Sequence, residues 1–159
     1  MINLLRQIRK REEGSVVVEA ALLLPIMLTL GLGAVDASNM MLQNHKIETQ
    51  LVMAGNYLAK SQTPNLYETQ AKNLASTGQL ESGGTEIIPG WSASDVSVSY
   101  SSVTNATTAS GTEYLAGSTV TVVTVSTSVS YQGFGILRSM FGPSIQLTGS
   151  YEERVIGTA

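Results

Sequence analysis

The sequence lacks cysteine altogether and contains a single histidine, His45, among its 159 residues. Without cysteine there are no disulfides, no thiolate metal ligands and no cysteine nucleophiles. A nucleophilic triad needs a base that a carboxylate orients, and His45 lies in a polar stretch typical of an exposed helix face. No glycine-rich phosphate loop with its Lys and Ser or Thr is present. The sequence therefore predicts no cofactor, no metal site and no catalytic residue, and we expect that the protein is not an enzyme.

Charge is also scarce and unevenly distributed. Only 13% of the residues are charged, about half the usual share of a soluble protein. The formal net charge of −3 argues against nucleic acid as a partner, because such binding needs a basic surface. Residues 1–14 carry four basic and two acidic side chains, which leaves five basic and ten acidic ones for residues 15–159. A basic tip before an apolar run stays in the cytoplasm, so we interpret residues 1–14 as a cytoplasmic leader.

The apolar run follows this leader directly. Residues 15–35 read SVVVEAALLLPIMLTLGLGAV, and Glu19 is the only ionisable residue among them. As a helix these residues are about 31 Å long, close to the hydrocarbon thickness of a bilayer. We therefore expect a transmembrane helix over residues 15–36. Pro25 removes one backbone hydrogen bond and is expected to kink it.

A cleaved secretory signal peptide is the alternative interpretation of the same segment, since it also has a basic start and an apolar middle. Gly33, Ala34 and Ala37 offer the small residues that a signal peptidase needs. Against this, the run is long for a signal peptide, and an acid inside it would have no purpose there. An acid within a span usually has a partner, although Glu19 also lies near enough to the cytoplasmic face to reach headgroups or water.

The spacing between Gly14 and Glu19 gains its specificity from the basic leader before it and from the single span, which contains no other acid. Gly14 ends the charged segment, and Glu19 is the fifth residue after it. This arrangement resembles a type IV prepilin, in which a membrane peptidase cuts after the glycine and the fifth mature residue is Glu. The wider run, with Leu24-Pro25 inside the span and Asp36 at its end, resembles the TadE-like pseudopilins of the tight-adherence (Tad) pilus system. One departure is Ala20, where family members usually have an aromatic residue.

The resemblance implies cleavage between Gly14 and Ser15 and a role as a minor pilin in surface adherence. The freed α-amine of Ser15 would be largely cationic at neutral pH, and Glu19 of one subunit could meet this ammonium on the next and fix the register. The implied partners are the prepilin peptidase, other pilin and pseudopilin subunits, the inner-membrane assembly platform and the lipid bilayer. The implied location is the bacterial inner membrane, with a single span and the C-terminal domain outside.

A second function of another class fits the same sequence. The chain could be a signal-anchored extracytoplasmic binding protein, in which a β-rich domain binds a ligand and the helix only tethers it. Mature protein that still begins at Met1 would favour this alternative.

Beyond the span, residues 37–62 are expected to continue the helix outside the membrane. Four apolar residues recur at spacings of four, three and four and form one stripe, which we expect to pack on the protein's own sheet: Ile47, Leu51, Ala54 and Leu58. Pro64 should stop this helix, and a shorter helix over residues 66–76 should end at Gly78.

The remainder of residues 63–159 is expected to form an antiparallel β-sheet. Alternating apolar residues predict strands over residues 96–100, 118–131 and 145–151, and we expect Trp91 to fill the core at the sheet edge. In the middle strand the valines change parity, which predicts a β-bulge near Val122. The fold class is therefore α+β and pilin-like, with a long N-terminal helix whose outer half packs on a small antiparallel sheet.

Overall fold

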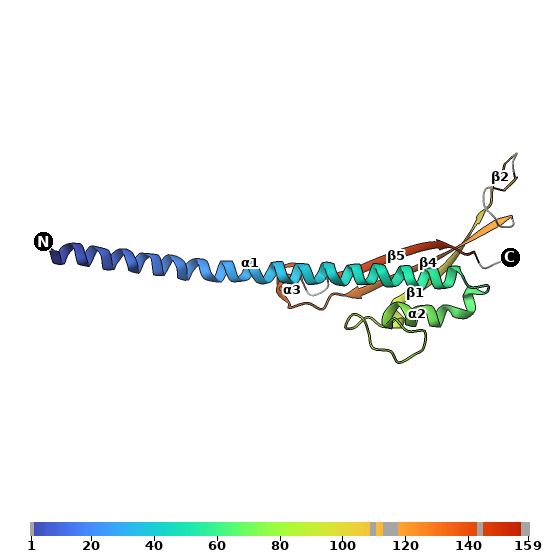
Figure 1. Ribbon diagram of the computed structural model, residues 1–159, viewed down its shortest axis with the longest axis horizontal. Coiled ribbons are helices and arrows are strands. Elements are labelled where there is room, and N and C mark those ends of the chain that lie inside the picture. The colour runs from blue at the N-terminus through green and yellow to red at the C-terminus, as the bar shows by residue number, and fades with distance from the viewer. Residues whose placement is uncertain (1, 109–110, 113–117, 143–144, 157–159) are drawn as a thin grey trace.

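The computed structural model describes residues 2–108, 111–112, 118–142 and 145–156, and it has the expected α+β architecture (Figure 1). The helices are α1 (Ile2–Ala59), α2 (Glu68–Thr77) and α3 (Ile136–Phe141), with 3-10 turns η1 (Pro64–Tyr67) and η2 (Ala93–Asp95). The strands are β1 (Val96–Thr104), β2 (Thr107–Thr108), β3 (Gly111–Thr112), β4 (Thr119–Ser130) and β5 (Gln146–Arg154). An antiparallel sheet has the order β1-β4-β5, and β2 pairs with β3.

Helix α1 dominates the shape of the molecule. Its 58 residues correspond to about 87 Å, and its N-terminal half projects away from the rest of the chain (Figure 1). The helix continues through Pro25, whose carbonyl accepts a 2.8 Å hydrogen bond from the hydroxyl of Thr29. A kink at Pro25 stays a prediction. The helix ends at Ala59, close to the expected boundary.

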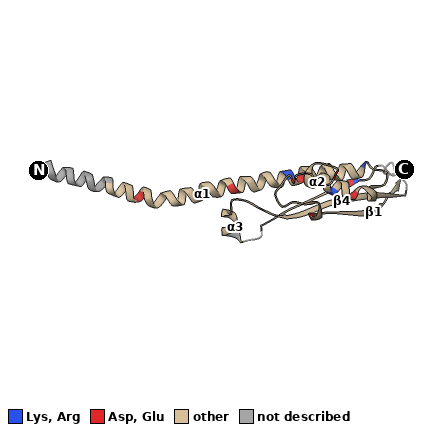
Figure 2. Cartoon of the chain, turned by 90° about the horizontal axis from the view of Figure 1, so that it is seen from below, with Lys and Arg blue, Asp and Glu red and all other residues tan. Residues whose placement is uncertain are grey.

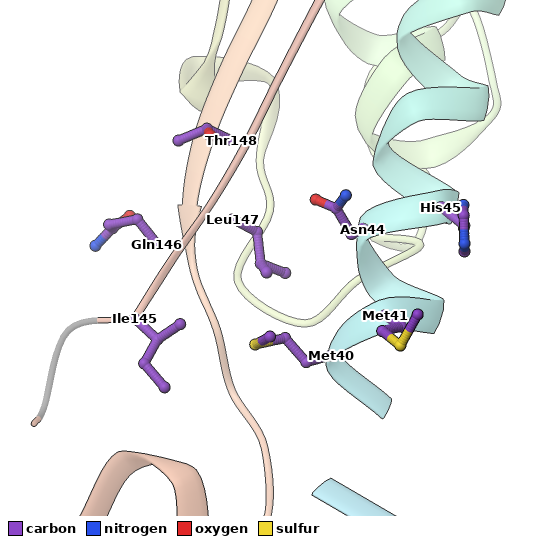
Figure 3. A pocket seen from close by; sticks show the side chains of 8 residues that line it. All are labelled: Met40, Met41, Asn44, His45, Ile145, Gln146, Leu147 and Thr148. Atoms are coloured by element: carbon purple, nitrogen blue, oxygen red, sulfur yellow. The ribbon is translucent and has the colours of Figure 1, made fainter. Parts of the chain in front are cut away.

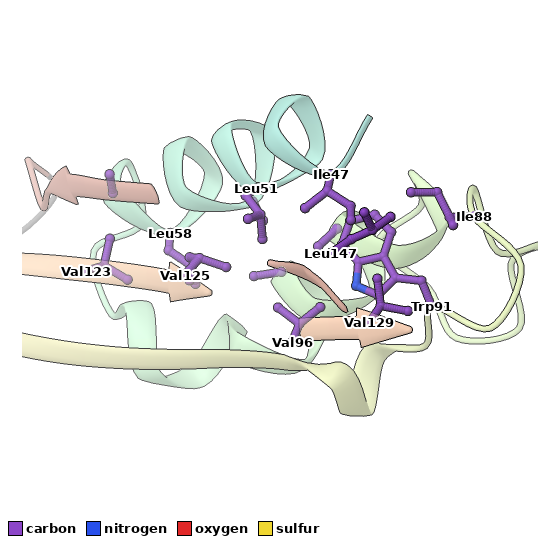
Figure 4. Packing of buried hydrophobic residues seen from close by; sticks show 14 of the residues in the cluster. Ile47, Leu51, Leu58, Ile88, Trp91, Val96, Val123, Val125, Val129 and Leu147 are labelled. Carbon is purple, nitrogen blue, oxygen red and sulfur yellow. The ribbon is translucent and has the colours of Figure 1, made fainter. Parts of the chain in front are cut away.

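The apolar stripe of α1 packs on the sheet, as its spacing predicted. Ile47, Leu51, Ala54 and Leu58 are all at most 1% exposed. They meet valines of β4 and Leu147 of β5 in the core shown in Figure 4. Trp91 is fully buried in the same core, and its indole N–H donates a 2.9 Å hydrogen bond to the hydroxyl of Thr127. The core thus covers only the C-terminal half of α1.

Two glycines let α1 and β5 approach closely. A Cβ on Gly55 of α1 would lie 2.5 Å from Cδ1 of Tyr151 in β5, and a Cβ on Gly149 of β5 would lie 2.8 Å from Cδ1 of Leu51. Each glycine therefore makes room for a side chain of the other element. The edge strand β5 is held against the helix by this reciprocal fit.

The segment after α1 also follows its sequence signals. Pro64 starts the η1 turn, which leads directly into α2. Gly78 caps α2 in the left-handed conformation, with φ of 74°, and its N–H donates a 2.9 Å hydrogen bond to the carbonyl of Leu74. Glycine adopts this conformation without the steric cost that a Cβ imposes.

The bulge expected near Val122 is wrong. Val122 pairs one to one with Ser101 of β1 and with Arg154 of β5, and the described ladders continue without an inserted residue on either side. The valines change parity because the two ends of β4 use opposite faces of the sheet. Val123 faces the core under α1, whereas Val120 and Val122 help to line a separate pocket of about 310 Å³ at the other end.

Candidate functional site

The N-terminal half of α1 is an apolar surface that the rest of the chain leaves uncovered. Its large apolar side chains between residues 16 and 35 are 52–69% exposed. The most apolar 18-residue window of this helix contains no buried residue, and within the described residues α1 is the one helix long and apolar enough to cross a membrane. An exposed apolar surface of this size needs an apolar partner such as a bilayer or other helices.

The four residues that the sequence singled out all lie on this projecting half. Gly14, Ser15, Glu19 and Pro25 are exposed, and a Cβ on Gly14 would meet no atom within 4 Å. The structure brings none of them into contact with the sheet. Among the described residues, Glu19 has no hydrogen-bond or ion-pair partner. Their roles in processing, register and bending stay predictions.

Charged side chains avoid the same region. Figure 2 shows few acidic or basic residues along the described N-terminal half of α1, whereas both kinds gather at the end covered by the sheet and α2. This separation divides the molecule into an apolar stem, residues 14–35 of α1, and a polar folded domain, which comprises the rest of the described chain from Asp36 onwards.

Asp36 lies where the stem meets the folded domain. Its carboxylate is completely buried. Oδ1 accepts hydrogen bonds from the hydroxyl of Tyr131 at 2.6 Å and from the backbone N–H of Phe134 at 3.1 Å. Oδ2 accepts a hydrogen bond from the backbone N–H of Leu137 at 3.0 Å. One acidic side chain therefore joins α1 to the end of β4 and to the first turn of α3.

The segment between β4 and α3 is shaped to fit this carboxylate. A Cβ on Gly133 would collide with Oδ1 of Asp36 and with the ring of Tyr131. Gly135 has φ of 90°, a left-handed conformation that favours glycine. The N–H groups at the start of α3 then point at the acid, as in other helix caps.

Tyr131 completes the junction. Its hydroxyl also lies 2.8 Å from the backbone carbonyl of Asp36, and it accepts a 3.3 Å hydrogen bond from Nδ2 of Asn39. Burial, reinforced by the neighbouring Asp36, raises the pKa of Tyr131 above its usual value. The phenol therefore stays protonated and remains a donor.

Sequence reasoning noted Asp36 only as part of a family resemblance and missed this intramolecular contact. Its partners lie 95 to 101 positions later in the chain, so no local pattern links them. The signal that was present is the run Tyr131-Gln132-Gly133, in which a glycine stands two residues after the tyrosine that ends the strongest predicted strand.

A groove of about 460 Å³ lies between α1 and the start of β5, and Figure 3 shows its lining side chains. Its walls are largely apolar and include Met40, Ile145 and Leu147. His45 stands at the rim, 71% exposed, and its Nδ1 lies 3.4 Å from a carboxylate oxygen of Glu48. The expected position of His45 on an exposed helix face is therefore confirmed. Across the described parts of the chain, no group of three His, Asp or Glu side chains is placed to hold a metal ion.

Comparison with known proteins finds a family match within α1. Residues 14–49 match the model of the TadE-like protein family. The matched region begins at Gly14 and includes the exposed apolar stem, Asp36 and the first turn that the sheet covers. It agrees with the resemblance that the sequence motifs indicated, over 36 of the 159 residues. No curated protein matches the chain, and no solved structure matches it.

Proposed function

We propose that this chain is a pseudopilin, or minor pilin, which is anchored in the bacterial inner membrane and takes part in assembling a Tad-type pilus for surface adherence. The observation that carries this proposal is the stem of α1. It is apolar on all sides, it is long enough to span a bilayer, and it continues without a break into the half that the sheet covers. Such a stem can lie in the membrane before assembly and among neighbouring helices afterwards.

Processing after Gly14 by a prepilin peptidase is the second part of the proposal. The family match begins at this glycine, and Gly14 is exposed with open space around its Cα. The basic residues that precede it in the sequence would keep the leader, and therefore the cleavage site, on the cytoplasmic side. The folded domain would then lie outside the cytoplasm.

Glu19 is proposed to set the register between subunits. It is the only acid between residues 14 and 35, and its side chain is exposed on the stem. In a stack of parallel stems, its carboxylate would meet the Ser15 ammonium of a neighbouring subunit. Each charge would gain its partner only on assembly, which favours one register over others.

The role is structural rather than catalytic. Its partners would be the prepilin peptidase, other pilin and pseudopilin subunits, the assembly platform in the inner membrane, and lipid. Among the described residues that line the groove beside Met40, the one titratable side chain is His45, which pairs with Glu48.

Intact mass spectrometry of the chain from bacterial membranes and from sheared filaments tests the proposal. We expect a mature protein that begins at Ser15. Recovery of Met1 would instead support the alternative, a signal-anchored extracytoplasmic binding protein. A start beyond Ala34 would indicate a cleaved signal peptide and would contradict both forms of anchoring. A Gly14→Leu variant should keep Met1 if a prepilin peptidase cuts at this position.

A further inference from the structure

The loop between β4 and β5 places an apolar side chain at the outer end of the stem. Phe134 is 74% exposed, as much as any large apolar side chain that the structure describes. Its backbone N–H is bonded to Asp36, the first residue after the apolar run. Phe134 therefore lies at the level where the stem leaves a bilayer that it spans from residue 15.

Helix α3 lies at the same level. A Cβ on Gly33 of the stem would be 3.9 Å from Cγ2 of Ile136, and the N–H of Leu137 is bonded to Asp36. Both Figure 1 and Figure 2 show α3 as the part of the folded domain nearest the N-terminal half of α1. The sheet and α2 extend in the opposite direction, so α3 and its preceding loop form the tip that faces the stem.

The composition of this tip suits a membrane interface. Residues 134–141 read FGILRSMF, with five large apolar residues and one basic residue. Aromatic and aliphatic side chains with an accompanying Arg or Lys are typical of segments that lie at the boundary between headgroups and acyl chains. Leu137 packs towards the core, but Phe134 has no such cover.

We infer that this tip, formed by residues 133–141, is a second membrane contact, which places Phe134 in the outer interface of the same bilayer that the stem spans. The inference rests on the proposed membrane anchor. The occupant is lipid, because the tip is continuous with the apolar stem and lies at its outer end. Asp36 holds the tip in place through Phe134 and Leu137, so that its own charge is fully bonded next to the hydrocarbon.

Site-directed spin labelling tests the inference on the full chain in phosphatidylcholine and phosphatidylglycerol vesicles. The chain has no cysteine, so Phe134→Cys gives one unique label. Leu66→Cys is the matched control, because Leu66 is also 74% exposed but follows the far end of α1. Leu23→Cys, in the middle of the stem, reports on the anchor itself. For each label we would measure the collision rate with oxygen, which concentrates in lipid, and the collision rate with a water-soluble nickel chelate.

We expect the label at position 134 to collide more often with oxygen than with nickel, although by a smaller margin than the label at 23. The label at 66 should collide more often with nickel. A label at 134 that behaves like the one at 66, while the label at 23 favours oxygen, would overturn the tip contact and leave the anchor intact. A label at 23 that favours nickel would overturn the anchor and the inference with it. Spin–spin broadening at 134 that disappears on dilution with unlabelled chain would assign the tip to a second copy instead of lipid.

Discussion

Tyr131 donates a 2.6 Å hydrogen bond to the carboxylate of Asp36, a residue 95 positions earlier in the chain. At the other end of the sheet-covered half of α1, the N–H of Ile156 donates a 2.7 Å hydrogen bond to the carbonyl of Ala59. The folded domain is therefore fastened to the helix near both ends, with the apolar stripe between them. Neither attachment lies in the exposed stem.

Tyr131→Phe should destabilise the folded domain while leaving its packing almost unchanged. The substitution removes one donor to a buried carboxylate, and hydrogen bonds to charged groups contribute about 1.5 to 3 kcal/mol. Thermal or denaturant unfolding in detergent micelles, followed by circular dichroism, measures the loss. Tyr67→Phe is the control, because Tyr67 is 40% exposed. Equal stability of the two variants would mean that the junction at Asp36 contributes little.

Gly55→Ala should also destabilise the domain, although alanine is the better helix former. The new Cβ would lie 2.5 Å from Cδ1 and 2.9 Å from Cε1 of Tyr151. The ring cannot easily move, since it packs against the core and its hydroxyl is bonded to Glu153. Overpacking of this kind costs about 1 to 3 kcal/mol.

The matched control is Gly31→Ala in the same helix, where a Cβ would meet nothing within 4 Å. Unfolding measured under identical conditions should show no loss for this variant. A loss at Gly31 as large as that at Gly55 would indicate a general effect of the helix rather than the fit against Tyr151.

The stability of the domain should fall between pH 10 and pH 12. Burial, together with the negative charge of Glu68, raises the pKa of Tyr100 from 10.0 to about 12. The unfolded chain therefore loses this proton first, and the contribution of Tyr100 is complete below pH 10 and disappears as the pH rises through about 12. Unfolding free energies across this range should decline less steeply in Tyr100→Phe. Glu68→Gln should remove only part of the decline, and an unchanged slope in Tyr100→Phe would contradict the assignment.

Glu19→Val should leave the chain in the membrane but exclude it from filaments. Removal of an acid makes the span more apolar, so insertion should survive. The Ser15 ammonium of the neighbouring subunit would lose its counter-charge. An unpaired buried charge costs about 3 to 5 kcal/mol, enough to lower incorporation into filaments by about a hundredfold or more. Glu19→Gln should be intermediate, because an amide oxygen still accepts a hydrogen bond.

The measurement is the ratio of each variant in sheared filaments to the variant in the membrane pool. Glu48→Gln on the folded domain is a suitable control, since Glu48 is itself exposed and its partners in the described structure, Asn44 and His45, lie on the same helix. If Glu19→Val and Glu48→Gln enter filaments equally well, Glu19 merely reaches the interface and does not set the register.

Local signals in the sequence predicted the helices and strands. The features that sequence analysis missed depend on contacts between residues that are distant in the chain. The spacing of Ile47, Leu51 and Leu58 gave the buried face of α1 correctly because helical periodicity depends only on neighbours. The bulge near Val122 was wrong because valine parity was read as if one face of the strand were covered throughout. The bond between Asp36 and Tyr131 depends on how α1 and β4 meet, which no local pattern contains.

For the candidate site, the sequence identified the residues but not their surroundings. Gly14 and Glu19 were found from their spacing, the basic leader and the resemblance to prepilins, and the structure adds that both lie on an uncovered stem. Their proposed functions depend on a peptidase and on other subunits. These functions stay predictions that the mass and filament experiments address.

Because α1 is one continuous helix, a change in the tilt of the stem also moves the part of the helix beyond Asp36. The helix extends for about 35 Å from Asp36 to Ala59, and the folded domain is bonded to this part of the helix at both of these residues. A change of about 20° in the tilt of the stem, within the range seen for membrane spans, would swing the far end by about 12 Å. If the stem spans a membrane as proposed, a small change in its tilt, imposed by neighbouring helices, would produce a large displacement of the folded domain.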